Sequence, residues 1–383
     1  TMSDNTVPAL INEIDENLKN VHTQSLDISF NELLDMVTSS ELDISPDYQR
    51  IFRWSAGAQS RFIESLLLEM PVPPIYVVEI EDNKKLLIDG LKRLSSYLHF
   101  RGELNAPEEP VCINKGEKLI LTDCDIIESL NGKTYDDLGT ALQIKLKRSF
   151  VRVEVVRKSS NHKFKYHMFK RLNTGGTLLT DQQMRNCTIR LLDNKFNDFI
   201  IALSKNENFK ITTENLTQEQ IFGAYDQELV LRFFTFLNNR DAFKHDIRDF
   251  MTEYMEQVSD PDHNREFDFT AQEQIFEKTF EILAKVLGNQ SFSRANINRT
   301  KLASMFTVYQ FESFALGIQD HIEALDISTE EKCQQLKLFF TEIKLDDDYI
   351  SLTTGGGKNT PNALNARVNF VSDKIRGFLT NGH

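Results

Sequence analysis

The spacing of apolar residues divides the chain into two parts that differ in predicted secondary structure. Up to about residue 160, short segments rich in β-branched and aromatic residues are bounded by Pro, Gly, Asp or Asn, which is typical of strands. The predicted strands are SLDIS (25–29), PIYVVEI (74–80), KLLI (85–88) and VRVEVV (151–156). Apolar residues recur at helical spacing over 30–38 and 58–69. This part is therefore predicted to be α/β or α+β.

After residue 160 the apolar spacing is helical almost throughout. Long amphipathic segments at 226–239, 271–288 and 301–318 predict a helical domain. Many of the 28 Phe residues fall in these segments, and we expect them to fill the core of a helical bundle. We therefore predict an α+β domain over residues 1–160 and a helical domain over 161–383.

Composition fits an ordinary globular chain. The 383 residues are 40% hydrophobic and 26% charged, which is typical of a folded protein with two or three domains. We find neither a secretory leader nor an apolar run of the ~18 residues that a membrane helix needs. The four cysteines lack the spacing of a zinc ribbon or a disulfide framework: Cys112, Cys124, Cys187 and Cys333. We therefore expect a cytoplasmic protein.

The formal net charge of −13 argues against a chain that coats nucleic acid through bulk electrostatics, because such binding depends on clustered Lys and Arg. One local basic segment remains, KLKRSFVRVEVVR (145–157), in which Lys147 and Arg148 are candidate DNA contacts. The simpler interpretation is the solvated face of a strand and of the helix that follows it.

A first group of polar and aromatic residues lies in ISPDYQRIFRW (44–54). Gln49, Arg50 and Arg53 stand beside Tyr48 and other aromatic residues. Guanidinium groups bind phosphates through two hydrogen bonds, and aromatic faces stack on bases. The alternative is a surface loop that is anchored by its aromatic side chains.

A second group lies in LLIDGLKRLSS (86–96). A strand is predicted to end at Ile88, Asp89 to be the N-cap of a helix, and Gly90 to allow a tight turn. A strand, a tight turn and a helix N-terminus form an anion site, which Arg93 would reach from one turn further on. Asp89 would hold a divalent metal, orient a water or cap the helix. The structural alternative is a cap and a surface pair between Asp89 and Arg93. Three leucines are predicted to face inward: Leu91, Leu94 and Leu98.

A third group lies in FKRLNTGGTLLTDQQMRN (169–186). A helix from about His162 is predicted to end at 173–174, and Thr180 with Gln183 forms a capping box for the next helix. The remaining polar side chains have the chemistry to bind a phosphate or a purine edge: Arg171, Asn173, Thr174, Gln182, Arg185 and Asn186.

Together, in this order and spacing, these segments and ESLLLEMPVPPIYVVEI (64–80) resemble the N-terminal domain of GmrSD-type restriction endonucleases, which has a ParB- and sulfiredoxin-like core. The resemblance covers roughly residues 25–190. It implies nucleotide handling in defence against foreign DNA, with cutting by a separate or appended HNH-type domain. In the family, an Asp-Gly-x-x-Arg motif is linked to nucleotide binding and hydrolysis.

By position, three segments match the motifs of that family. Asp89, Gly90 and Arg93 match the Asp-Gly-x-x-Arg motif, and a tyrosine-glutamine-arginine element is matched by Tyr48, Gln49 and Arg50. The glycine-rich element is matched by Arg171, Asn173, Thr174, Gly175 and Gly176. The family often has two glutamines where this chain has Leu91 and Lys92, a change that keeps a phosphate donor and weakens the case for hydrolysis.

Two expected features of related nucleases and ATPases are missing from the sequence. The helical half has no HNH-like cluster, since His245 and His321 stand alone, so we do not expect this chain to cut DNA by that chemistry. TTGGGKNTP (353–361) departs from a Walker loop, because Leu352 replaces its first glycine and Asn359 its Ser or Thr. We expect a flexible loop whose residues can still contact a phosphate.

The resulting hypothesis is a nucleoside triphosphate at the Asp89–Gly90 turn, with Asp89 and Arg93 as catalytic residues and Mg²⁺ on Asp89 assisting any hydrolysis. Lys92 and the matched residues of the other two segments would contact the nucleotide, and a separate nuclease or defence protein is the expected partner. The alternative is a non-enzymatic module that binds DNA or a partner protein. Its DNA-binding groove would join Arg50, Arg53 and the 145–171 segment. In a degenerate family member, the Asp-Gly-x-x-Arg motif would only stabilise the fold and bind no ligand.

Overall fold

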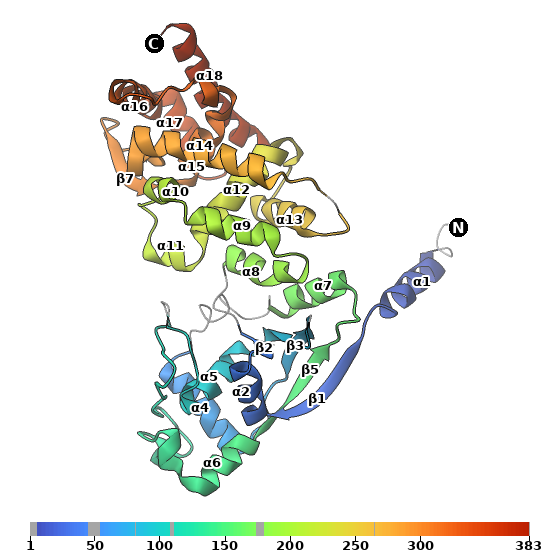
Figure 1. Ribbon diagram of the computed structural model, residues 1–383. Helices are drawn as coiled ribbons and strands as arrows, with labels where there is room; N and C mark the ends of the chain where they lie inside the picture. Colours follow the sequence, from blue (N-terminus) through green and yellow to red (C-terminus); the bar gives the residue numbers. More distant parts are fainter. Residues whose placement is uncertain are drawn as a thin grey trace. The chain divides into compact units, whose positions relative to one another are not determined.

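A computed structural model describes residues 6–44, 54–80, 82–107, 111–173, 180–263 and 265–382. Its internal contacts divide the chain into two compact units. The first unit comprises Thr1–Leu179 and Asn186–Leu191, and the second comprises Thr180–Arg185 and Leu192–His383. Figure 1 shows a sheet-containing unit and a helical unit, and each is considered separately below.

The first unit is built on a mixed five-stranded sheet. Its strands are β1 (Thr23–Ser29), β2 (Leu42–Asp43), β3 (Ile75–Glu79), β4 (Lys85–Asp89) and β5 (Phe150–Val156). They lie in the order β1-β5-β3-β4-β2. β3 is antiparallel to β4 and parallel to β5, while β1 pairs antiparallel with β5 and β2 parallel with β4. The sheet therefore joins strands that are far apart in the sequence.

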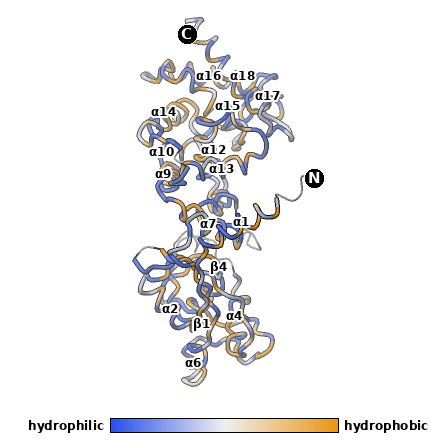
Figure 2. The backbone as a smooth tube through the Cα atoms, turned by 90° about the vertical axis from the view of Figure 1, so that its right-hand side faces the viewer, coloured by the Kyte–Doolittle hydropathy of each residue, from blue (hydrophilic) through white to orange (hydrophobic). Residues whose placement is uncertain are grey.

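The two faces of this sheet have different covers because side chains alternate along each strand. Val77 and Leu87 join a core with the helices α2, α4, α5 and α6, whereas their neighbours Val78 and Leu86 pack with Phe169 of α7 on the other face. The helices are α1 (Thr6–Leu18), α2 (Phe30–Thr38), α4 (Ala56–Leu67), α5 (Leu91–Arg101), α6 (Gly139–Arg148) and α7 (His162–Asn173), with the short 3-10 helices η1 (Glu128–Leu130) and η2 (Tyr135–Leu138). In Figure 2 the strands near β4 are coloured as hydrophobic.

The helix α8 (Asp181–Thr188) and the 3-10 helix η3 (Ile189–Leu191) lie where the two units meet along the chain. The second unit then contains α9 (Lys195–Ser204), α10 (Glu207–Thr212), α11 (Gln218–Phe222), α12 (Tyr225–Asn239), α13 (Ile247–Ser259), α14 (Phe269–Leu287), α15 (Val308–Gly317), α16 (Glu330–Leu345), α17 (Asp347–Thr353) and α18 (Pro361–Thr380). A hairpin of β6 (Ser293–Ala295) and β7 (Leu302–Phe306) and the 3-10 helices η4 (Arg240–Ala242), η5 (Gly288–Gln290) and η6 (Gln319–Ala324) complete it.

Phenylalanines form the centre of the helical unit, as the sequence predicts. Phe233 on α12 lies 5.7 Å from both Phe276 and Phe280 of α14, and these two rings are 4.4 Å apart, measured between ring centroids. All three side chains are fully buried. Aromatic pairs at these separations add to the burial of apolar area, so this cluster explains the high Phe content.

The predicted fold class, an α+β region followed by a mostly helical one, is confirmed. The four predicted strands correspond to β1, β3, β4 and β5, and the predicted helices at 30–38, 58–69, 226–239 and 271–288 correspond to α2, α4, α12 and α14. The helix predicted over 301–318 is wrong in its first third, because Leu302–Phe306 is a strand that pairs with β6. The domain boundary after residue 160 stays a prediction. Among the described residues, no helix combines the length and apolarity needed to cross a membrane.

Candidate functional site

The Asp89–Gly90 turn connects the end of β4 to the start of α5. Asp89 is the last strand residue and faces Tyr76 of β3 in the sheet register. Gly90 is the residue that precedes the helix, and no side chain caps α5. The prediction that Asp89 is the N-cap is therefore wrong. The reason is that pairing with β3 holds Asp89 in extended geometry one residue too early to reach the first helical amides.

Only glycine fits at position 90. Its φ is 110°, in the region that side-chain-bearing residues rarely adopt. A Cβ placed there would lie 2.7 Å from Cγ1 of Ile75, which is fully buried at the start of β3. The absence of a side chain thus lets the turn pack directly on β3. The first N–H groups of α5 have no partner within the helix, as at every helix N-terminus.

Arg93 is held against this turn. Its Nη2 donates to the carbonyl of Pro74 at 2.7 Å and lies 3.8 Å from Oδ2 of Asp89. The side chain of Arg93 is 16% exposed and that of Asp89 is 42% exposed. Burial lowers the pKa of the Arg93 guanidinium, while the charge of Asp89 acts to raise it. The predicted pairing of Asp89 with Arg93 is therefore observed, with the arginine largely buried.

One donor of the Arg93 guanidinium lacks a partner in the part of the chain that the structure describes. Its Nε is buried and has no hydrogen-bond partner among the residues that the structure describes. A buried donor without a partner is uncommon in folded proteins. Its neighbours behave as the sequence predicts: Leu94 and Leu98 are fully buried, and Leu91 packs against the cores on both faces of the sheet. Lys92 is half-buried.

The sequence of this unit matches a known family. Residues 30–190 match the family model described as the GmrSD restriction endonuclease, N-terminal domain. Residues 30–190 belong to this family. The match begins at α2 and runs through the Asp89–Gly90 turn and α7 to η3, so it confirms the resemblance that the motifs suggest. Comparison with curated proteins and with solved structures finds no match. These residues are thus a restriction-system domain, which implies a role in defence against foreign DNA.

The other two motifs of the GmrSD N-terminal domain are described only in part. Tyr48, Gln49, Arg50 and Arg53 lie outside the described residues, as do Thr174, Gly175 and Gly176. The helix α7, which contacts β4, ends at Asn173, and Arg171 is exposed in its last turn. The predicted end of the helix is therefore confirmed, whereas the approach of the following loop to the Asp89–Gly90 turn stays a prediction.

The polar residues of α8 have structural partners. Thr180 and Gln183 form the predicted capping box, with bonds of 3.0 and 3.2 Å between each backbone N–H and the other side chain. Arg185 is 3% exposed and binds Glu228 at 3.2 Å, and burial lowers its pKa. Gln182, which accepts a bond from Arg185, is fully buried. The prediction of a phosphate contact is therefore wrong for Gln182 and Arg185, because both are enclosed in the second unit.

The basic segment after residue 145 begins on a helix rather than on a strand. Lys147 and Arg148 lie in the last turn of α6, where positive charges stabilise a helix C-terminus. Arg148 lines a cavity of about 790 Å³ that also contains Asp27 and Glu69. Arg152 binds Asp27 at 2.8 Å, so acidic residues partly neutralise this face of the domain.

No preformed metal centre stands among the described residues, where no three His, Cys, Asp or Glu side chains group together. Asp89 is the carboxylate at the turn. Mg²⁺ is commonly bound by one or two carboxylates together with substrate phosphates, so this single carboxylate fits a metal that arrives with a nucleotide. His245 is exposed in the loop between η4 and α13, and His321 is half-buried on η6.

Proposed function

We propose that the GmrSD N-terminal domain of this chain binds a nucleoside triphosphate with Mg²⁺ at the Asp89–Gly90 turn, and that binding regulates a separate effector in defence against foreign DNA. The observation that carries this proposal is the position of Arg93, a largely buried arginine fixed beside a strand-to-helix turn, one of whose donors binds none of the described residues. Turns of this type bind phosphate through helix amides and the helix dipole.

The contacts of the turn suggest how phosphate would be accommodated. The Asp89–Arg93 pair is 3.8 Å long, so it is weak enough to be replaced by a shorter contact with a phosphate oxygen. Arg93 would remain anchored to the carbonyl of Pro74, which fixes the direction of the guanidinium. Asp89 would then be free to bind the Mg²⁺ that accompanies the phosphates. Lys92, Arg171 and Asn173 are the further contacts that the motif proposes.

Hydrolysis is the second step of the proposal. In phosphoryl transfer the protein mainly positions the phosphates and stabilises their charge, which Arg93 would do. When bound, Mg²⁺ would neutralise part of the phosphate charge. Asp89 would hold that ion and orient the attacking water through its second carboxylate oxygen. A domain that binds the nucleotide without hydrolysing it would act as a nucleotide sensor. The catalytic role of Asp89 and Arg93 is therefore tested separately from their role in binding.

Calorimetry of the full chain with ATP or GTP and Mg²⁺ tests binding, and phosphate release tests hydrolysis. We expect Arg93→Gln to weaken binding at least tenfold and Asp89→Asn to affect release more than affinity. Arg152→Gln is the matched control, because Arg152 is an arginine of the same domain that is paired with Asp27 and not with Asp89. Absence of saturable binding, or equal binding by folded Arg93→Gln protein, would refute the proposal. If DNA binding with a steep salt dependence were found instead, and lost in a Lys147→Gln/Arg148→Gln variant, the non-enzymatic alternative would replace it.

A further inference from the structure

A second cavity with the chemistry of an anion site lies inside the helical unit, apart from the GmrSD N-terminal domain. It has a volume of about 660 Å³ and lies between the β6–β7 hairpin and the end of α17. Its lining includes two arginines, Arg294 and Arg299, and no acidic residue. In a chain with a formal net charge of −13, a cavity lined in this way is selective for an anion.

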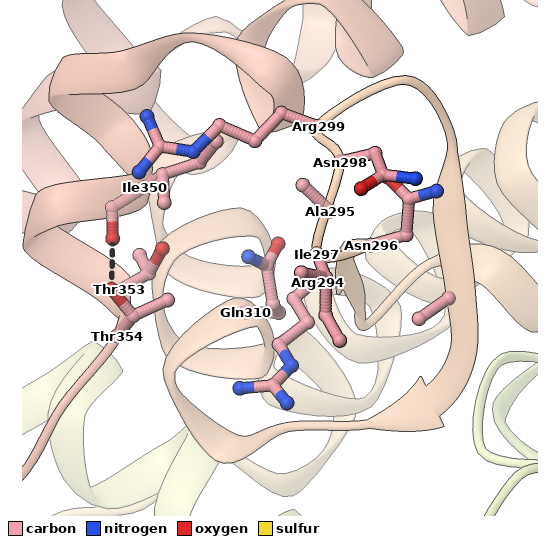
Figure 3. A pocket seen from close by; sticks show the side chains of 11 residues that line it. Arg294, Ala295, Asn296, Ile297, Asn298, Arg299, Gln310, Ile350, Thr353 and Thr354 are labelled. Atoms are coloured by element: carbon pink, nitrogen blue, oxygen red, sulfur yellow. Dashed lines mark hydrogen bonds between the residues drawn. The ribbon is translucent and has the colours of Figure 1, made fainter.

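Figure 3 shows how these side chains are placed around the cavity. Arg294 and Arg299 come from the hairpin, Thr353 and Thr354 lie on the opposite side, and Gln310 of α15 stands between them. Arg294 is exposed, and within the described ranges it has neither an ion pair nor a hydrogen bond. Arg299 is paired with Asp347 at 2.6 Å, but both side chains are more than half exposed. A surface pair of this kind contributes little and is readily exchanged for a ligand.

Gln310 supplies the observation that points to a ligand. Its side chain is only 1% exposed. The amide oxygen accepts hydrogen bonds from Nζ of Lys344 at 2.9 Å and from the hydroxyl of Tyr349 at 2.8 Å. These two donors determine which end of the amide is the oxygen, and so they leave the NH₂ group for the cavity. Among the residues described, this NH₂ group makes no hydrogen bond, and because Gln310 lines the cavity, both of its protons are left for a ligand there.

Lys344 fixes the geometry of the whole site. It is fully buried, and its other two protons are donated to the carbonyls of Ser291 at 2.8 Å and Ser293 at 3.0 Å. Ser293 directly precedes Arg294 in the chain, so one lysine anchors both Gln310 and the strand that carries Arg294. The amide of Gln310 and the backbone that carries Arg294 are therefore held by the same buried lysine before any ligand binds, which is the property of a built site.

The remaining lining favours a nucleotide over a simple phosphate ion. The hydroxyls of Thr353 and Thr354 donate to the carbonyls of Tyr349 and Ile350, at 2.9 and 2.7 Å. Their oxygens are consequently left as acceptors, which suit the hydroxyls of a ribose or the amino group of a base. Ile350 adds apolar surface beside them. Arginines for a phosphate, acceptors for a sugar and an apolar wall together match a mononucleotide.

We propose that this cavity binds a mononucleotide, with its phosphate on Arg294, Arg299 and the amide of Gln310. The segment TTGGGKNTP (353–361), which is predicted to be a flexible loop able to contact a phosphate, would thus contribute its first two threonines to a nucleotide site that is not a Walker loop. Lys358 in the same loop donates to the carbonyl of Ser351. The proposal does not depend on nucleotide binding at the Asp89–Gly90 turn, since all its residues belong to the second unit.

Calorimetry of the full chain in EDTA with AMP, GMP, CMP and UMP tests the proposal, using an Arg93→Gln background to remove the other site. We expect at least one of the four to bind saturably, and Arg294→Gln or Arg299→Gln to weaken it at least tenfold. Gln310→Glu is the sharper variant, because it keeps an acceptor for Lys344 and Tyr349 while replacing the amide donor with a negative charge. It should abolish binding without loss of thermal stability.

Arg376→Gln is the matched control, since Arg376 is an exposed arginine of the same unit that is paired with Asp373 at 3.0 Å. The Arg376→Gln variant should bind the nucleotide with the same affinity as the Arg93→Gln background protein. Lack of saturable binding by all four nucleotides would overturn the proposal, as would unchanged binding in Arg294→Gln and Arg299→Gln. Equal affinity for ribose 5-phosphate would overturn the assignment to a nucleotide.

Discussion

Gly90→Ala is expected to destabilise the first unit much more than a glycine replacement that introduces only the backbone strain. The added Cβ would have to share space with Cγ1 of Ile75 at 2.7 Å, and alanine would have to adopt a φ of 110°. Gly116 provides the comparison, because its φ is 99° but nothing lies within 4 Å of a Cβ built there. The two replacements therefore share the conformational cost and differ in the clash with β3.

The magnitude follows from these two terms. A left-handed conformation costs alanine roughly 1–2 kcal/mol, and replacing glycine returns about 0.4–1 kcal/mol by restricting the unfolded chain. Gly116→Ala should therefore destabilise by only about 1 kcal/mol. Overfilling a packed site costs a further ~1–3 kcal/mol, so Gly90→Ala should destabilise by about 2–4 kcal/mol. The difference between the two variants measures the contact with Ile75.

Trp54 makes the measurement specific to this unit. It is the single tryptophan of the chain, it packs against the core of the first unit, and its ring lies 6.0 Å from that of Phe62. Urea unfolding followed by tryptophan fluorescence therefore reports on the α+β unit alone. With a slope of about 2 kcal/mol per M, the midpoint of Gly90→Ala should fall ~0.5–1.5 M below that of Gly116→Ala.

A double-mutant cycle with Ile75→Ala gives the decisive test. Ile75→Ala removes Cγ1 and Cγ2 of Ile75, which lie 2.7 and 3.3 Å from the added Cβ, and leaves the Cβ of Ile75 at 3.3 Å. The double variant should therefore be less destabilised than the sum of the single ones by ~1–3 kcal/mol, as expected for residues in contact. Equal midpoints for Gly90→Ala and Gly116→Ala, or additive effects in the cycle, would refute the close packing of the turn on β3.

Two further predictions concern buried charges and phenols. Glu312→Gln should destabilise the helical unit by about 3 kcal/mol, because Glu312 is fully buried between Arg232 at 2.9 Å and Arg367 at 2.7 Å. Thermal unfolding followed by circular dichroism should show this loss, and an unchanged melting curve would contradict it. Burial raises the pKa of Tyr97 to about 12, because the folded protein favours the neutral phenol. The contribution of this phenol to the free energy of unfolding should therefore be complete below pH ~10 and be lost as the pH rises towards 12. Ultraviolet titration of phenolate in Tyr97→Phe should lose one late-titrating group, and loss of an early one instead would show that Tyr97 is accessible.

Elements with a strong local pattern could be predicted from the sequence, and those that depend on distant partners could not. β3 and β4 are marked by apolar runs between turn residues. β2 has only two residues and exists because Leu42 and Asp43 pair with Lys85 and Leu86. The sequence predicts helix at β7 because its apolar spacing continues into α15. What makes it a strand is its pairing with β6 across a loop in which Asn296 accepts bonds from the amides of Thr300 and Lys301, and this is not encoded in periodicity.

The candidate sites differ in the same way. The proximity of Asp89 and Arg93 follows from local geometry, since a strand end and the first turn of a helix are joined by one glycine. The hydrogen bond from Arg93 to Pro74 could not be predicted, because it depends on which strand lies next to β4. Gln310 had no sequence signal at all. Its role arises from Lys344 and Tyr349, which are 34 and 39 residues away in the chain.

Whether an arginine's donors are already hydrogen-bonded within the protein is a better guide to ligand binding than the number of basic residues nearby. Arg185 stands in a motif-rich segment, yet its guanidinium binds Glu228, Thr252 and the carbonyl of Arg248. A phosphate would have to displace all of these contacts and also enter a buried site, at the desolvation cost of a second charge. Arg93 and Arg294 are different, because each is carried by an anchored backbone and retains unengaged donors within the described part of the chain. Phosphate recognition requires both properties, so replacement of Arg93 or of Arg294 should remove binding at its own site while the fold is retained.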